Sequence, residues 1–114
     1  MRKQKNIRLS LIRKAAEKIG HAFDVEKVIL FGSYASKSQS NDSDIDLLVV
    51  LEPTKHLAEI RYDIHTLLRD FPFPMDIVLR TPGQIQTAKH RRDWFIQDVI
   101  SNGLLLYGKE TGTH

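Results

Sequence analysis

The chain has 114 residues, a net charge of +3 and no cysteine. This length suits one domain, so we expect a single domain over 1–114 with mobile ends at 1–6 and 108–114. The lack of cysteine excludes a disulfide scaffold and a Cys-ligated zinc or iron–sulfur site. Because no apolar run is long enough to span a membrane and no signal-peptide core is present, we expect a cytoplasmic protein without membrane contact.

The positive charge is concentrated at the N-terminus. Residues 1–18 hold seven basic side chains and one acidic side chain, and the remainder holds ten basic and thirteen acidic ones. A basic arm of this kind could contact nucleic acid or an acidic protein. Since no aromatic residue interleaves the charges as a stacking platform would, we favour a solvated helix face over nucleic-acid binding.

The first half of the chain predicts a helix and two strands. Apolar residues at helical spacing indicate a helix over about 6–20, with Gly20 as its stop. Two apolar runs at 25–31 and 45–51 predict strands, and the second reads as buried on both faces. Between the strands we expect a short helical turn and then a polar loop over 38–43.

The second half predicts a helix, a third strand and further helices. Thr54 is placed to cap a helix that stops near Asp70, before two prolines. Residues 75–80 predict the strand, and the pair at 81–82 predicts a helix start. This order of elements predicts an α+β fold, an α/β sandwich in which a small mixed β-sheet has helices packed on one face.

The C-terminal part combines basic and aromatic residues. We expect a last helix over about 93–101, followed by 104–107 as a short strand or a docking tail. The basic cluster at 89–92 could bind nucleic acid or an acidic partner, or simply be a solvated helix start. We expect Trp94 and Phe95 to belong to the core; if both were exposed, a partner site would explain them better.

The segment between the first two predicted strands carries the chemistry. Gly32 and Ser33 follow the first strand, and ten residues later Asp44 and Asp46 open the second. Glycine lets the backbone approach a phosphate closely, and the Ser33 hydroxyl adds a donor. Because side chains alternate along a strand, Asp44 and Asp46 point the same way, and their repulsion favours a cation between them. Such oxygen ligands suit Mg²⁺ together with a nucleotide.

A third carboxylate, Asp76, lies in the third predicted strand. If the second and third strands are neighbours, Asp76 can reach the same patch, ligate a second metal ion and take a proton from an attacking hydroxyl. For Asp44 and Asp46 the alternative is a solvated strand edge or a helix cap. For Asp76 the alternative is a buried salt bridge to Arg80 or Arg61.

Gly32-Ser33, ten residues, Asp44-x-Asp46 and the later Asp76 resemble the signature of the polymerase-β-like nucleotidyltransferase superfamily. The short length is similar to that of minimal nucleotidyltransferase (MNT) domains, which include MntA-type antitoxins. The resemblance implies this family's fold, transfer of a nucleoside monophosphate from a triphosphate to a hydroxyl, and two Mg²⁺ ions held by three carboxylates. By position, Gly32 and Ser33 would hold the triphosphate. Asp44 and Asp46 would bind the metals, and Asp76 would ligate the catalytic metal and help deprotonate the acceptor.

One motif position departs from the family pattern. Many members have Gly-Ser-x-Ala-Arg-Gly, whereas this chain has Ser36 and Lys37 in place of the last two residues. Lys37 could replace the missing cation at the phosphates, although an ammonium group lacks the bidentate geometry of a guanidinium. The departure bears on catalytic strength and not on the fold.

The resemblance also implies a partner. MNT proteins often pair with a small helical HEPN protein, commonly an RNase toxin, and act as its antitoxin, in some systems by adding AMP to a toxin tyrosine. We therefore expect a Mg²⁺-dependent nucleotidyltransferase that uses ATP to modify a HEPN-type partner. One alternative is a binding module of the same fold that neutralises its partner by occlusion. A second is a nucleic-acid-binding protein that works through residues 1–18.

Overall fold

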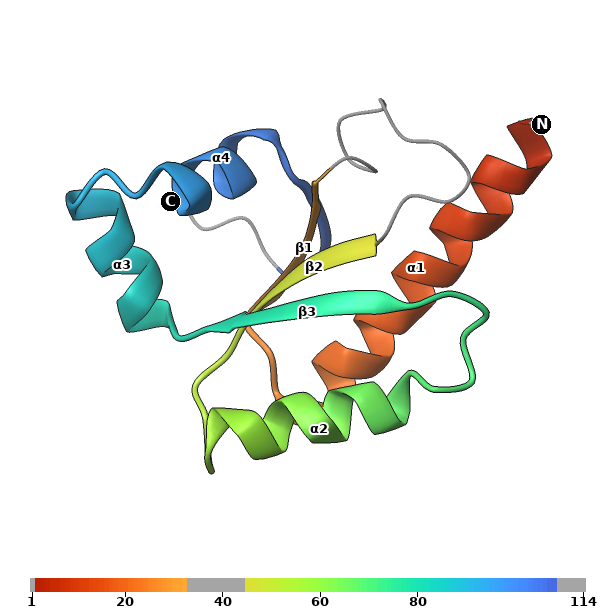
Figure 1. Ribbon diagram of the computed structural model, residues 1–114, viewed down its shortest axis with the longest axis horizontal. Coiled ribbons are helices and arrows are strands. Elements are labelled where there is room, and N and C mark those ends of the chain that lie inside the picture. Colours follow the sequence, from red (N-terminus) through yellow and green to blue (C-terminus); the bar gives the residue numbers. More distant parts are fainter. Residues whose placement is uncertain (1, 33–44, 109–114) are drawn as a thin grey trace.

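The computed structural model describes residues 2–32 and 45–108, with side chains described from Arg8 onward. This part of the chain contains a four-stranded sheet in the order β3-β2-β1-β4 (Figure 1). The strands are β1 (Lys27–Phe31), β2 (Ile45–Val50), β3 (Met75–Arg80) and β4 (Leu104–Gly108). β1 is antiparallel to both β2 and β4, whereas β2 and β3 are parallel. The sheet is therefore mixed, as predicted.

Helices cover both faces of this sheet. They are α1 (Arg2–Phe23), α2 (Leu57–Leu67), α3 (Pro82–His90) and α4 (Trp94–Asn102). α1 and α2 pack on one face, and α3 and α4 lie on the other (Figure 1). The α+β prediction is confirmed, but the expectation of helices on one face is corrected. The reason is that alternate strand residues on the second face, such as Leu48 and Val50, are apolar too and pack near Val99 of α4. None of the described helices is long and apolar enough to cross a membrane.

Helix α1 continues past Gly20, which we had expected to end it. Gly20 is buried against the ring of Tyr107 on β4, and a Cβ atom at this position would overlap that ring. The same ring packs edge-on against His21, with ring centroids 5.6 Å apart. Glycine is therefore required here by close packing between α1 and β4, and not by the end of the helix.

Gly20→Ala is expected to destabilise the protein by about 1–3 kcal/mol, because the added methyl group forces the Tyr107 ring out of position. Gly83→Ala in α3 is the matched control, since its Cβ would meet only Thr81 Oγ1 at 3.8 Å. That change should stabilise the protein by up to about 1 kcal/mol through helix propensity. Urea unfolding measures both. Stabilisation by both changes would contradict the packing role of Gly20.

The predicted helix starts have mixed outcomes. Thr54 does not cap α2; the chain bends there, and His56 occupies the N-cap without a side-chain hydrogen bond. The preceding Lys55 instead pairs with Asp63, nearly two turns into the helix, at 2.5 Å. At α3 the prediction is confirmed: the Thr81 hydroxyl accepts from the Gln84 amide N–H, and the Gln84 side chain accepts from the Thr81 N–H.

The ends of the last two elements follow the sequence signals. The Asp93 carboxylate accepts from the Ile96 N–H and caps α4, which ends before Gly103. The segment after Gly103 forms β4 along β1, so of the two alternatives for 104–107 the strand is confirmed.

The loop between α2 and β3 packs on the basic face of α1. Phe71 and Phe73 are half-buried against the core. The Arg8 guanidinium lies 5.1 Å from the Phe73 ring centroid, and Lys18 Nζ lies 5.7 Å from that of Phe71. These cation–π contacts help to hold the loop that delivers the chain into β3. Two basic side chains of the N-terminal segment 1–18, Arg8 and Lys18, therefore contact aromatic rings of the same chain.

Candidate active site

Two of the predicted carboxylates are brought together by the parallel pairing of β2 and β3. Asp46 and Asp76 are direct register partners. Side chains at partnered positions of adjacent strands stand on the same face, so the two carboxylates are neighbours. Asp46 is half-buried and Asp76 is exposed. The expectation that the second and third strands are neighbours is confirmed, and with it the placement of Asp76 beside Asp46.

Alternation along β2 decides which face carries this pair. Leu47 points into the core beneath α1 and α2, so Asp46 points to the opposite face together with Leu48. The acidic pair therefore shares a face with α3 and α4, but it lies at the start of β2 and β3. Asp76 is the member of the pair that is exposed to solvent, whereas Asp46 is half-buried.

Gly32 lies directly against the Asp46 side chain. Phe31, the last residue of β1, is the register partner of Asp46, and the chain leaves the strand at Gly32 with a φ of +83°. A Cβ atom on Gly32 would overlap Asp46 Oδ2. Both the left-handed backbone and the lack of space thus favour glycine at this position. The structure thus places Gly32 against Asp46, whereas the expected contact of Gly32 with a phosphate stays a prediction.

Three other predicted site residues cannot be placed in the same way. Ser33, Lys37 and Asp44 lie outside the described residues. Their expected roles therefore stay predictions.

The alternative of a buried salt bridge for Asp76 does not agree with its surroundings. Asp76 is exposed, and within 2–32 and 45–108 it forms no ion pair. Arg80, one of its two suggested partners, donates instead to the Leu79 carbonyl oxygen at 2.8 Å. A carboxylate on the open end of a strand remains accessible to a ligand or a proton donor.

The donor set fits a hard divalent cation. Asp46 and Asp76 offer adjacent carboxylate oxygens, the ligand type that Mg²⁺ prefers. Among the described residues no three His, Cys, Asp or Glu side chains converge, and the third expected carboxylate, Asp44, lies outside them. Two like charges side by side repel, and a cation between them removes that repulsion. The donor set of the acidic pair is therefore compatible with a divalent metal ion.

An aromatic wall beside the acidic pair was missed by the sequence analysis. The Phe31 ring meets the Phe95 ring edge-on, with centroids 5.3 Å apart. Trp94 is 84% exposed and Phe95 41% exposed, so their assignment to the core was wrong. The nine-residue α4 turns only Ile96 and Val99 fully toward the sheet. The signal that could have revealed this wall is the position of Phe31 opposite Asp46 on the neighbouring strand. That position is known only once the register of β1 and β2 is known.

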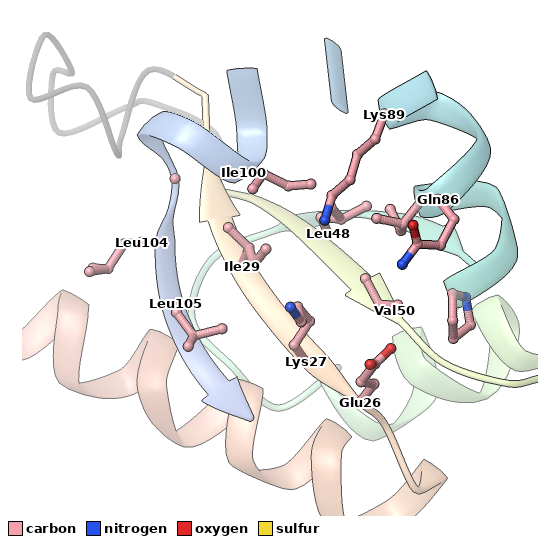
Figure 2. A pocket seen from close by; sticks show the side chains of 13 residues that line it. Glu26, Lys27, Ile29, Leu48, Val50, Gln86, Lys89, Ile100, Leu104 and Leu105 are labelled. Atoms are coloured by element: carbon pink, nitrogen blue, oxygen red, sulfur yellow. The ribbon is translucent and has the colours of Figure 1, made fainter. Parts of the chain in front are cut away.

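A separate cavity of about 650 Å³ lies at the other end of the same face, between the sheet and α3 and α4. Leu48 and Val50 lie at its floor, and Lys89 and Gln86 extend toward it from α3 (Figure 2). Neither Asp46 nor Asp76 lines it. The cavity and the acidic pair therefore occupy opposite ends of β2, a separation that the sequence analysis did not predict.

Comparison with known proteins identifies the family. The family model described as "Polymerase beta, Nucleotidyltransferase" matches residues 13–112. The chain belongs to the polymerase beta nucleotidyltransferase family. The acidic pair and the adjoining Gly32 lie within the matched range of this nucleotidyltransferase.

A curated relative agrees with this assignment. The archaeal protein named "Putative protein adenylyltransferase MJ1305", from Methanocaldococcus jannaschii, is 42% identical over 65 residues. The match covers 57% of this nucleotidyltransferase and 41% of the relative. The chain thus spans less than half the length of the curated relative that it matches.

Solved structures share the fold. A toxin–antitoxin crystal structure with AMP-PNP superimposes with a TM-score of 0.62 at 23% identity, covering 86% of this chain and 74% of the other. A "putative nucleotidyltransferase" from Sulfolobus solfataricus gives 0.62 at 26% identity, with 96% and 88% covered. A mutant of the toxin–antitoxin MntA-HpeT gives 0.60 at 21% identity, with 86% and 74% covered. The nucleotidyltransferase fold inferred from the sequence is confirmed.

Proposed function

We propose that this nucleotidyltransferase transfers AMP from ATP to a hydroxyl of a partner protein in the presence of Mg²⁺, and that it acts as the antitoxin of a HEPN-type RNase toxin. The observation that carries the proposal is the direct pairing of Asp46 with Asp76, with Gly32 packed against Asp46. Family membership supports nucleotidyl transfer as the chemistry.

Each site residue has a role in the proposed reaction. Asp44, Asp46 and Asp76 hold two Mg²⁺ ions, which when bound neutralise charge on the phosphates. Gly32, Ser33 and Lys37 bind the triphosphate.

The transfer itself is a displacement at the α-phosphorus. The acceptor oxygen forms a bond to that phosphorus, the bond to pyrophosphate breaks, and the hydroxyl proton passes to a carboxylate. Asp76 suits the last role because it is the exposed member of the pair and can be approached by an acceptor from outside the chain. Positioning supplies much of the acceleration in a reaction of this kind.

The partner and the nucleotide are inferred from the relatives. The curated relative is named a protein adenylyltransferase, and one neighbour is a toxin–antitoxin crystallised with AMP-PNP. The MntA-HpeT mutant carries two aspartate-to-glutamate substitutions at positions separated by a single residue, as Asp44 and Asp46 are here. These names support ATP as the donor and a toxin as the acceptor.

The test is transfer of label from ATP. The purified chain is incubated with Mg²⁺, ATP labelled at the α-phosphate and the protein encoded by the adjacent gene. We expect label on that protein with ATP, weaker label with the other triphosphates, and none when EDTA removes the metal. Tight binding of the adjacent protein without any binding of Mg-ATP in isothermal titration would instead support neutralisation by occlusion, the alternative that the Ser36 departure suggests.

A further inference from the structure

Helix α4 exposes several large apolar side chains in addition to the two that it buries, beside an exposed polar pair formed by Asp98 and Asn102. Its buried residues are Ile96 and Val99, yet Trp94, Phe95 and Ile100 are 84%, 41% and 40% exposed. Among the described residues, five large hydrophobic side chains are exposed, and four of them belong to α4 or the residue that opens β4. Large apolar side chains that are exposed together are typical of interaction sites, so this concentration marks a surface that packs against another molecule.

The turn before α4 supplies positive charge next to this apolar surface. Arg91 and Arg92 lie in this turn and are both exposed, and the exposed Lys89 lies just before it in the last turn of α3. Of the two carboxylates nearby, Asp93 caps α4, and Asp98 accepts a hydrogen bond from the Asn102 side chain at 2.7 Å. Tryptophan and arginine are the residues most often found to dominate binding energy at protein interfaces. The combination fits a partner that is acidic around an apolar recess.

The position of this surface relative to the site agrees with such a role. Phe95 contacts Phe31, which is the register partner of Asp46. A protein docked on the outer side of α4 therefore reaches the edge of the acidic pair. On its other flank, Ile100 borders the cavity into which Lys89 extends (Figure 2). That flank offers the partner a recess lined by apolar side chains together with polar ones such as Gln86 and Lys89.

We propose that Arg91, Arg92, Trp94, Phe95 and Ile100, here called the α4 surface, dock an acidic face of the protein that accepts the nucleotide. This inference rests on the proposed function for the identity of the partner. A second copy of the chain is disfavoured because two basic turns would repel each other. RNA would match the cations and could stack on Trp94, but it offers little to cover Phe95 and Ile100.

The experiment measures binding of the protein encoded by the adjacent gene, without nucleotide, by isothermal titration. Trp94→Ala is expected to weaken binding about 30-fold, as for an interface hot spot. Tyr62→Ala is the matched control, because Tyr62 is 72% exposed but lies on α2, over the other face of the sheet. The pair Arg91→Glu and Arg92→Glu should weaken binding and reduce its salt dependence. Arg13→Glu on α1, also exposed, controls for net charge.

The outcomes separate this proposal from the proposed function. Asp46→Asn should bind the partner like the wild type and fail only in transfer. Loss of binding in the α4 variants, with no transfer by the wild type, would support the docking surface and refute the enzyme. Normal binding and labelling in the α4 variants would refute the docking surface and leave the proposed enzyme activity intact. A wild type that does not bind this partner would also refute the docking surface.

Two further measurements address the competing occupants. Sedimentation would show a dimer that Trp94→Ala converts to monomers if a second copy covered α4. An RNA oligonucleotide bound by the wild type and released by the arginine variants, with protein binding unchanged, would identify RNA. Either result would overturn the proposal.

Discussion

Replacing Asp46 or Asp76 with asparagine is expected to reduce AMP transfer by at least about 100-fold, a loss of the size seen when one electrostatic contact to a transition state is removed. Asparagine keeps the shape of the side chain but removes the negative charge that attracts a cation. Because the two residues are register partners, each change should affect the same step. Rates of label transfer from ATP to the partner measure the effect.

The same variants allow a readout that does not depend on activity. Mg²⁺ should raise the melting temperature of the wild type, since a ligand that binds only the folded state stabilises it. It should do so less in Asp46→Asn and Asp76→Asn. Asp24→Asn is the matched control, because this carboxylate is exposed and precedes β1, at the opposite end of that strand from Phe31, the register partner of Asp46. Full transfer by both site variants, or an equal Mg²⁺ effect in all proteins, would remove the metal role of these residues.

Gly32→Ala is expected to lower transfer at least about 10-fold and to destabilise the fold by about 1–3 kcal/mol. The backbone φ of +83° is unfavourable for any residue with a Cβ atom. In addition, the new methyl group would displace the Asp46 carboxylate from its place beside Asp76. Steady-state transfer rates and urea unfolding report the two effects separately.

Gly108→Ala is the control that separates backbone strain from damage to the site. Gly108 also has a positive φ, +103°, and its Cβ would overlap the Glu26 carbonyl oxygen. It pairs with Lys27, at the other end of β1 from Phe31. Its substitution should therefore reduce stability with little effect on transfer per folded molecule. If Gly32→Ala lost stability alone, as Gly108→Ala is expected to do, the role assigned to Gly32 would be wrong.

Local sequence patterns correctly predicted those helix and strand boundaries that depend only on residues close by in the chain. The bounds of β3, the start of α3 at Thr81 and the end of α4 at Gly103 follow from signals within a few residues. The apolar character of β2 correctly indicated burial on both faces. The motif from Gly32 to Asp46 indicated the family without any knowledge of packing.

Contacts between distant segments account for the rest. Whether Asp76 stands beside Asp46 depends on parallel pairing of two strands separated by α2, which no local pattern encodes. Gly20 was mistaken for a helix stop because the ring that excludes a side chain there comes from Tyr107, far along the chain. Trp94 was assigned to the core because it is a large apolar residue. It is exposed because the short helix α4 packs on the sheet with its other side. The motif in the sequence therefore indicated the family and its carboxylates. Only the pairing of β2 with β3 placed Asp76 beside Asp46, because that pairing joins segments far apart in the chain.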